Sequence, residues 1–209
     1  MTPEGALEQG ASELAIPLAG EAREKLLHYA ALLTKWNKTY NLTAIRGPRE
    51  IVIQHVLDSL SVLPHLPGGE SLADVGSGSG APGLPIAIAR PQWPVTLNEA
   101  SGKKAAFLRQ AAIELALPNV SVHEGRAEAW QPPRRFDVVI SRAFAELAVF
   151  IRVCRHLVSS QGWLAAMKGA LSKAELAGVP DDCDCSKVVP IRVPLLDAAR
   201  HLVLCQARS

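Results

Sequence analysis

The chain has 209 residues and a mass of 22.3 kDa, and 22 lysines and arginines against 20 acidic residues give it a formal charge of +2. This near balance excludes a histone-like polycation and an acidic disordered chain, while 48% apolar residues suffice for a globular core. The N-terminus carries Glu4, Glu8 and Glu13 and no apolar run, so it does not resemble a secretory signal. Apolar stretches long enough to span a membrane are missing, and we expect a cytoplasmic protein.

Residues before position 70 have the periodicity of amphipathic helices. Apolar residues recur every three or four positions over 20–38, and again over 49–63. A segment rich in proline and glycine follows at 64–69. This pattern predicts a small helical cap over residues 1–69 and a second domain over residues 70–209.

Beyond residue 69, short apolar runs alternate with helical patterns. Strands are predicted at 71–75, 95–99, 120–123, 136–141 and 163–167, and helices at 82–89, 103–117 and 146–157. Such alternation predicts right-handed crossovers and a doubly wound, mostly parallel sheet. Two further strands, at 187–193 and 201–206, are too close in sequence for a crossover and should form an antiparallel hairpin. The expected fold is therefore an α/β fold with a seven-stranded sheet.

Residues 74–83 place four glycines between the first predicted strand and its helix. Glycines let the backbone turn sharply and approach a ligand closely, and a helix N-terminus offers unpaired N–H groups. Ligands bind open parallel sheets beyond the carboxyl ends of the strands, where this loop lies. A cofactor site is therefore expected here, with Gly78 in contact with the ligand.

Two classes of ligand suit this loop. Residues 78–83 match the GxGxxG pattern, and Glu99 follows at a spacing typical of the acid that binds a ribose in dinucleotide sites. Asp74, however, puts a carboxylate where a pyrophosphate would lie, and it suits a cationic ligand without phosphate. S-adenosylmethionine has an ammonium, a sulfonium and a ribose for Glu99. The two acids favour this methyl donor, and an NAD(P)-dependent oxidoreductase remains the alternative.

Four cysteines are present: Cys154, Cys183, Cys185 and Cys205. None forms a CxxC pair or stands beside a histidine at the spacing of a metal site. Because disulfides are rare in the cytosol, we expect four reduced thiols and no metal.

Several motifs, taken in order, resemble one family. They are Trp36-Asn37-Lys38, Asn41 to Ala44, His55 to Leu60, Asp74 to Gly83, Lys103 to Arg109, Arg126-Ala127-Glu128, Ser141 to Phe144, and Lys168-Gly169. Together they resemble the glucose-inhibited division B family, also called RsmG, over essentially the whole chain. Each motif is weak alone, but their number and order are specific.

The resemblance implies a bacterial class I, Rossmann-like methyltransferase. Its reaction would move a methyl group from S-adenosylmethionine to N7 of one guanine in 16S ribosomal RNA, as free RNA or within the small ribosomal subunit. The resemblance places cofactor contacts at Gly76, Ala81, the pair Ala127 and Glu128, and Arg142. Because the family usually has Phe or Leu where this chain has Ala81, a backbone contact is expected there.

Guanine N7 carries a lone pair and no proton, so its methylation needs no general base. Alignment of the reactants supplies roughly 7 to 11 kcal/mol in reactions of this kind. Arg142, at the end of the fourth predicted strand, is the leading candidate for recognition of the base and the one catalytic candidate. Phe144 either stacks on an extruded base or packs in the core.

His55 and Asp58 share a helix face, where an interdomain hydrogen bond or an RNA contact is expected. Lys103 and Lys104 either bind RNA phosphates or face solvent.

Basic residues are concentrated in two windows. Residues 31–49 contain four basic residues and no acid, and residues 134–173 contain seven basic residues and two acids. If the fold brings both windows to the strand ends, they form a surface for RNA phosphates. A monomer is expected, with small-subunit RNA as partner. A methyltransferase for a small molecule or a protein, and a cofactor-binding module without catalysis, remain alternatives.

Overall fold

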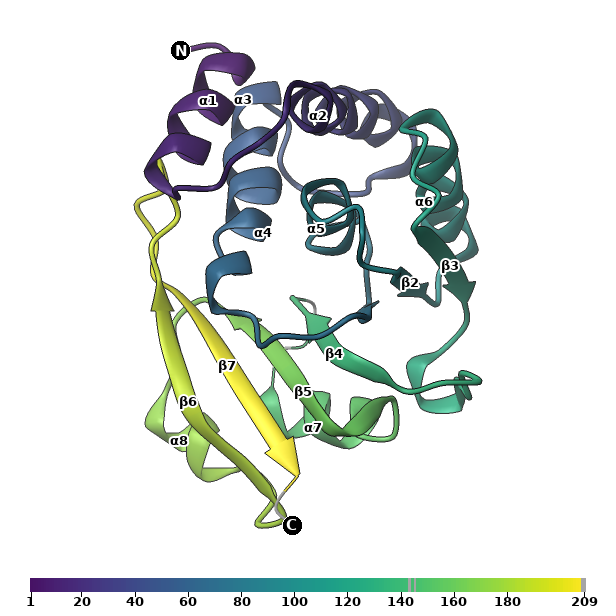
Figure 1. Cartoon of the computed structure of the whole chain (residues 1–209), viewed down its shortest axis with the longest axis vertical. Coiled ribbons are helices and arrows are strands. Elements are labelled where there is room, and N and C mark those ends of the chain that lie inside the picture. Colours follow the sequence, from purple (N-terminus) through teal and green to yellow (C-terminus); the bar gives the residue numbers. More distant parts are fainter. Residues whose placement is uncertain (143, 145, 208–209) are drawn as a thin grey trace.

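The computed structural model describes residues 1–142, 144 and 146–207 (Figure 1). Its helical elements are α1 (Pro3–Glu13), α2 (Gly20–Tyr40), α3 (Pro48–Ile51), the π-helical η1 (Val52–Leu57), α4 (Asp58–Leu60), η2 (Leu63–His65), α5 (Gly83–Ala89), α6 (Gly102–Glu114), η3 (Ala127–Ala129), α7 (Leu147–Cys154) and α8 (Lys173–Ala177). Its strands are β1 (Leu72–Val75), β2 (Val95–Glu99), β3 (Val120–Glu124), β4 (Phe136–Ser141), β5 (Val158–Lys168), β6 (Cys183–Ile191) and β7 (Arg200–Ala207).

The strands form one seven-stranded sheet in the order β3-β2-β1-β4-β5-β7-β6. Strands β1 to β5 are parallel, while β7 runs antiparallel to both β5 and β6. This arrangement confirms the predicted doubly wound sheet with a C-terminal hairpin. Because the parallel strands start level with one another, their carboxyl ends meet at one edge of the sheet.

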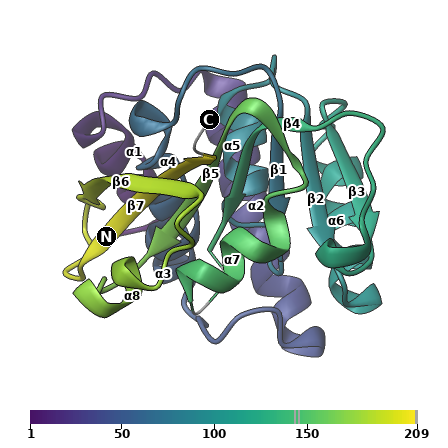
Figure 2. The same cartoon turned by 90° about the horizontal axis from the view of Figure 1, so that it is seen from below.

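Helices pack on both faces of the sheet (Figures 1 and 2). A cluster of buried side chains lies on each face. The first combines side chains of α1 to α6 with Leu72 and Ile140, and the second combines α7 with Val75 and Val139. Successive residues of a strand point to opposite faces, so the central strands β1, β4 and β5 contribute to both clusters, whereas β2 and β3 contribute only to the first. The N-terminal helices and one face of the sheet thus share a core, and the division at residues 69 and 70 remains a prediction.

Two helices were not predicted. Helix α1 begins after Thr2, whose side chain accepts a hydrogen bond from the backbone N–H of Gly5, and Pro3 occupies its first turn. Helix α8 has Ser172 as its N-cap, and none of its residues is buried. The buried face of α1 consists of Leu7 and the small residues Ala6, Gly10 and Ala11, and α8 buries nothing, so neither gives a strong apolar period.

The predicted helix over 49–63 is divided by a π-helical segment. Helix α3 continues into η1 and then into α4. The backbone hydrogen bonds of a π-helix such as η1 join residues five positions apart, rather than the four of an α-helix. Apolar spacing does not distinguish a single π turn from an α turn. Such π segments are frequent at functional sites.

The expectation of four reduced thiols is wrong, because Cys185 and Cys205 form a disulfide. The two residues are 20 positions apart in sequence but lie on adjacent antiparallel strands, with their Cα atoms 4.1 Å apart. The expectation rested on the rarity of disulfides in the cytosol, and the sequence alone does not show which cysteines face each other on adjacent strands. In the described ranges, no helix has the length and apolarity needed to cross a membrane.

Candidate cofactor and substrate site

The glycine loop follows β1 and turns through left-handed backbone conformations. Gly76, Gly78 and Gly80 have φ angles of 72°, 54° and 90°. A Cβ atom at Gly80 would meet Leu84 Cδ1 at 2.4 Å, whereas at Gly78 the nearest such atom is 3.7 Å away. Gly80 is therefore required by packing, while Gly78 leaves an open backbone cradle.

Strand β2 holds this loop in place. The N–H groups of Gly76 and Ser77 donate to the carbonyl oxygen of Asn98, at 2.9 and 3.0 Å. The carboxylate of Glu99 accepts from Gly78 N–H at 2.9 Å and from Ser101 N–H at 2.8 Å. Each Glu99 oxygen retains lone-pair capacity, so the side chain can accept further bonds from ribose hydroxyls.

Asp74 is buried beneath the loop, with 1% of its surface exposed. Its Oδ2 accepts a bond from Gly83 N–H at 2.9 Å, and its Oδ1 has no hydrogen-bond partner. Burial raises the pKa of this carboxyl to about 7, although the Gly83 bond and the charge of Arg142 lower it. A buried carboxylate oxygen without a partner fits a cation such as the ammonium or sulfonium of S-adenosylmethionine.

Three further predicted cofactor residues are Ala81, in the glycine loop, and Ala127 and Glu128, on η3. Ala81 and Ala127 are buried, and Glu128 is exposed on η3. The turn that precedes η3 is attached to β2, because Gly125 N–H donates to the carbonyl oxygen of Glu99 at 3.0 Å. The structure thus places this turn beside the end of β2, and direct contact of these residues with a cofactor remains a prediction.

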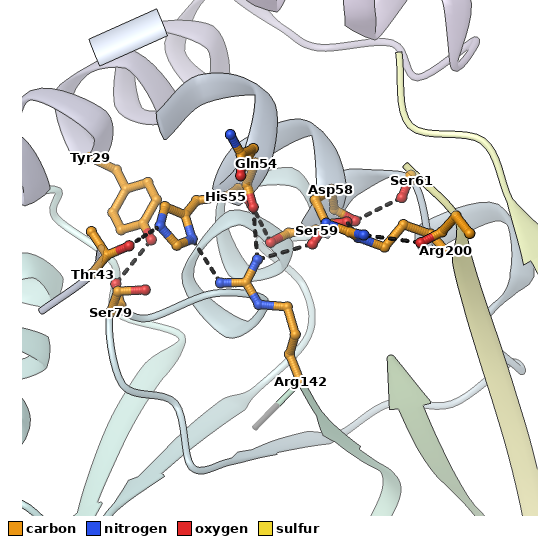
Figure 3. Close-up of polar contacts among 11 residues, drawn as sticks. Tyr29, Thr43, Gln54, His55, Asp58, Ser59, Ser61, Ser79, Arg142 and Arg200 are labelled. Atoms are coloured by element: carbon orange, nitrogen blue, oxygen red, sulfur yellow. Dashed lines mark hydrogen bonds and ion pairs between the residues drawn. The ribbon is translucent and has the colours of Figure 1, made fainter. Parts of the chain in front are cut away.

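Arg142 follows β4 and extends toward the N-terminal helices (Figure 3). Its Nη1 donates to the Gln54 carbonyl oxygen at 2.8 Å and to Asp58 Oδ2 at 2.9 Å. Its Nη2 donates to His55 Nδ1 at 2.7 Å. These bonds fix the guanidinium between the sheet and η1, and they give His55 and Asp58 hydrogen-bond partners within the protein.

Asp58 binds two arginines at once. Its Oδ1 accepts from Arg200 Nε at 3.0 Å, while Oδ2 accepts from Arg142. The Asp58 side chain is 2% exposed, but those of Arg142 and Arg200 are 25% and 27% exposed. The buried carboxylate therefore positions two cations that still reach solvent. Sequence analysis did not select Arg200, because nothing local to residue 200 indicates a partner so far away in sequence.

His55 is held in one neutral form. An arginine can only donate, so His55 Nδ1 accepts from Arg142, and Nε2 carries the proton and donates to Thr43 Oγ1 at 2.9 Å. Burial, and secondarily the charge of Arg142, lower the pKa of His55 to about 3. The imidazole is uncharged at neutral pH, and both of its nitrogens have protein partners.

A hollow of about 380 Å³ lies beside this network, and its walls include Ile45, Arg142, Lys168 and Arg200. Lys168 lies at the end of β5 and forms an ion pair with Glu175, with a distance of 2.6 Å between Nζ and Oε1. Arg142 and Lys168 come from the basic window 134–173, whereas the window 31–49 contributes only the apolar Ile45 to the walls, and Arg200 lies outside both windows.

The remaining candidates for RNA contact are Phe144, Lys103 and Lys104. The Phe144 ring packs against Phe150, with ring centroids 5.5 Å apart, which supports the core interpretation of this residue. Ala143, in the same sequence motif, lies outside the described residues. Lys103 is exposed at the start of α6 and Lys104 is half-buried.

The strand order, the glycine loop after β1 and the acids at the ends of β1 and β2 define a class I, Rossmann-like methyltransferase fold. A ribosomal protein L11 methylase from Lactobacillus delbrueckii subsp. bulgaricus superposes with a TM-score of 0.54 at 16% identity, covering 73% of this chain and 77% of that chain. An S-adenosylmethionine-dependent methyltransferase from Thiobacillus denitrificans, in complex with S-adenosyl-L-homocysteine, gives a TM-score of 0.50 at 13% identity, covering 73% of this chain and 90% of that chain.

Residues 22–203 match the GidB family, described as rRNA small subunit methyltransferase G. The chain is 51% identical to ribosomal RNA small subunit methyltransferase G of Chromobacterium violaceum, over 94% of each chain. It is 51% identical to the protein of the same name from Methylobacillus flagellatus, over 97% of this chain and 98% of that protein. The chain belongs to the GidB family of methyltransferases, as its sequence motifs predicted.

Proposed function

We propose that this protein transfers a methyl group from S-adenosylmethionine to N7 of one guanine in the 16S RNA of the small ribosomal subunit. The unpartnered Oδ1 of Asp74, buried beneath an open glycine cradle, is the observation that carries the choice of cofactor. Family membership supports the choice of RNA substrate. When bound, S-adenosylmethionine supplies an electrophilic methyl group.

Separate residues hold separate parts of the cofactor in this proposal. Asp74 binds the cationic end, the backbone at Gly76 and Gly78 lines the cradle, and Glu99 accepts bonds from the ribose hydroxyls. Ala81, the pair Ala127 and Glu128, and Arg142 complete the cofactor site.

Arg142 is the residue that positions the target base. Its guanidinium has five N–H donors, of which Gln54, Asp58 and His55 take three. No described residue accepts a hydrogen bond from the other two donors, so they can bind a ligand in the adjacent hollow. Guanine O6 is a suitable acceptor for them, and N7 must stay free because it attacks the methyl carbon.

No side chain needs to remove a proton in this reaction. The state of His55 agrees with that chemistry, because the ring is neutral and both nitrogens are already bonded. Catalysis then consists of alignment, together with the carboxylate of Asp74, which stabilises positive charge on the cofactor side of the site. Asp58 is already paired with two arginines, so it orients these cations and supplies no free negative charge.

The hollow also supports an RNA partner. Arg142, Lys168 and Arg200 surround it, and phosphates close to the target base are attracted by such a cluster. We further propose that the protein is a monomer and acts in the cytoplasm on free 16S RNA or on small subunits. Sedimentation equilibrium of the pure protein tests the monomer.

The test uses methyl transfer and mapping of the product. Purified protein is incubated with methyl-tritiated S-adenosylmethionine and small subunits or 16S RNA from a strain that lacks the corresponding methyltransferase. Nuclease digestion and mass spectrometry then locate the methyl group, and we expect one guanine modified at N7. Transfer to another atom, or no transfer to either substrate, would overturn the proposal. Binding of NADH without binding of S-adenosylmethionine in calorimetry would overturn the cofactor assignment.

A further inference from the structure

Three cysteine sulfurs converge at the end of the C-terminal hairpin distant from Arg200. Cys183 and Cys185 lie on β6, and Cys205 lies on β7. All three sulfurs are within 4.8 Å of one another, and the Sγ atoms of Cys183 and Cys185 are 4.0 Å apart. The proposed methyltransferase function does not use this cluster.

Strand geometry explains the convergence. Residues two positions apart on a strand point to the same face, so Cys183 and Cys185 both point into the core covered by α7. Asp184 pairs with Gln206 and Lys187 pairs with Leu204, with a register shift between these pairs. The register of Asp184 with Gln206 places the next residue, Cys185, opposite Cys205, to which it is bonded, and leaves Cys183 beside that bond.

We propose that Cys183, Cys185 and Cys205 form a thiol–disulfide exchange site. The thiolate of Cys183 attacks Sγ of Cys185, a new Cys183–Cys185 bond forms, and the Cys185–Cys205 bond breaks. The electron pair leaves on Cys205 Sγ, which takes up the proton that Cys183 lost. Two electrons move between sulfurs with no net oxidation, so the exchange needs no external oxidant or reductant.

A hollow beside the cluster gives reagents a route to it. Cys183 and Cys205 line this hollow of about 410 Å³, whose walls also include Arg155 and His156. The two cysteines are 5% and 0% exposed, so water and small reagents reach their sulfurs through the hollow rather than from the open surface.

Exchange changes which strands are covalently joined. In the structure the disulfide ties the edge strand β6 to β7, and after exchange both bonded sulfurs belong to β6. Strand β7 begins at Arg200, which binds Asp58, and it pairs with β5 through His201 opposite Lys168. Exchange therefore removes the covalent connection between β6 and β7 at this end of the hairpin, while the pairing of 187–191 with 200–204 near Arg200 remains.

Alkylation during exchange tests the proposal. The native protein is incubated with excess N-ethylmaleimide between pH 6 and 7.5, quenched, denatured and digested with trypsin. Cys183 and Cys185 fall in one peptide, 174–187, and Cys205 falls in another, 201–208. Exchange should yield the first peptide with an internal disulfide and the second with N-ethylmaleimide on Cys205. The rate of this labelling should rise about tenfold per pH unit, because the thiolate is the nucleophile.

Two variants complete the experiment. Cys183→Ser removes the attacking thiol and should abolish labelling of Cys205, while Cys154→Ala removes the other thiol outside the disulfide and should leave labelling unchanged. The wild-type pattern decides the proposal even if a variant does not fold. Label on Cys183 with the Cys185–Cys205 bond intact overturns it, as does a protein with all three thiols reduced, bound zinc on the three sulfurs, or no labelling at all.

Discussion

Nη1 of Arg142 donates to Oδ2 of Asp58 at 2.9 Å, joining two residues that are 84 positions apart in sequence. Asp58 also accepts from Arg200, so a single buried carboxylate orients two arginines at the edge of the hollow. Arg142 follows β4, Arg200 begins β7 and Asp58 begins α4. The geometry of the proposed RNA side of the site therefore depends on an element of the helical N-terminal region.

Asp58→Asn keeps the shape of the side chain and removes its charge. We expect methyl transfer to fall at least about tenfold, while the Kd for S-adenosylmethionine changes little, because the arginines lose their common anchor. Loss of charge-assisted bonds should lower the free energy of unfolding by about 1 to 3 kcal/mol. The matched control is Asp182→Asn, which breaks the exposed pair with Arg155 and should cost about 0 to 1 kcal/mol. Normal turnover in Asp58→Asn would remove this anchor from the mechanism.

Arg142→Ala should lower methyl transfer about 10²- to 10³-fold, the usual effect of removing a positioned donor. Arg142→Lys should recover little of this activity, since a lysine cannot bind Gln54, Asp58 and His55 and still donate to a base. Single-turnover assays with saturating RNA separate the chemical step from RNA binding. Full recovery by lysine would indicate that only the charge matters.

His55 gives the folded protein a characteristic dependence on pH. Its pKa is lowered from 6.5 to about 3, so the unfolded chain binds a proton below pH 6.5 that the folded protein does not. The stability contributed by neutral His55 is complete above pH 6.5 and is lost as the pH falls toward 3, by up to about 1.4 kcal/mol per pH unit. Denaturant unfolding of wild type and His55→Gln at several pH values measures the difference. An advantage of wild type that does not vary with pH would contradict this assignment.

The fold was largely predictable because its signals are local. Strand β2 and strand β4 have the predicted bounds, since apolar runs bounded by turn residues are visible in the sequence itself. Helix α8 was missed because its residues are not buried, and a solvated helix leaves no apolar period. The cross-strand disulfide was missed because it depends on the register of β6 against β7, which no local pattern specifies.

The candidate site was predictable only in part, for a similar reason. Glu99 ends β2 and Asp74 lies one residue before the end of the neighbouring parallel strand β1, so topology alone brings them to the same edge. The pairing of Asp58 with Arg200 could not be predicted in this way. Arg200 begins β7, which runs antiparallel to β5, and the parallel topology does not indicate its position. The π turn of η1, which carries His55, likewise has no signature in the apolar spacing.

Asp74→Asn should weaken the binding of S-adenosylmethionine and change its pH dependence. The pKa of Asp74 is raised to about 7, so in the wild type a bound proton must leave before the carboxylate attracts a cation. The wild-type Kd should therefore rise about tenfold per pH unit as the pH falls from 7 to 5.5. Asn keeps an acceptor for Gly83 N–H but cannot ionise, so its Kd should be higher and nearly constant. Calorimetry measures both, and parallel curves would contradict the role of Asp74.

Gly83→Ala tests the packing beneath the glycine loop. An added Cβ would lie 2.3 Å from Leu97 Cδ2 and 2.8 Å from Asp74 Oδ2, so buried groups would have to move. We expect a loss of about 1 to 3 kcal/mol in the free energy of unfolding and weaker cofactor binding, since Asp74 is displaced. Gly20→Ala is the control, because it also adds one methyl group but meets nothing within 4 Å. Equal stability of the two variants in denaturant unfolding would show that the space at Gly83 is not needed.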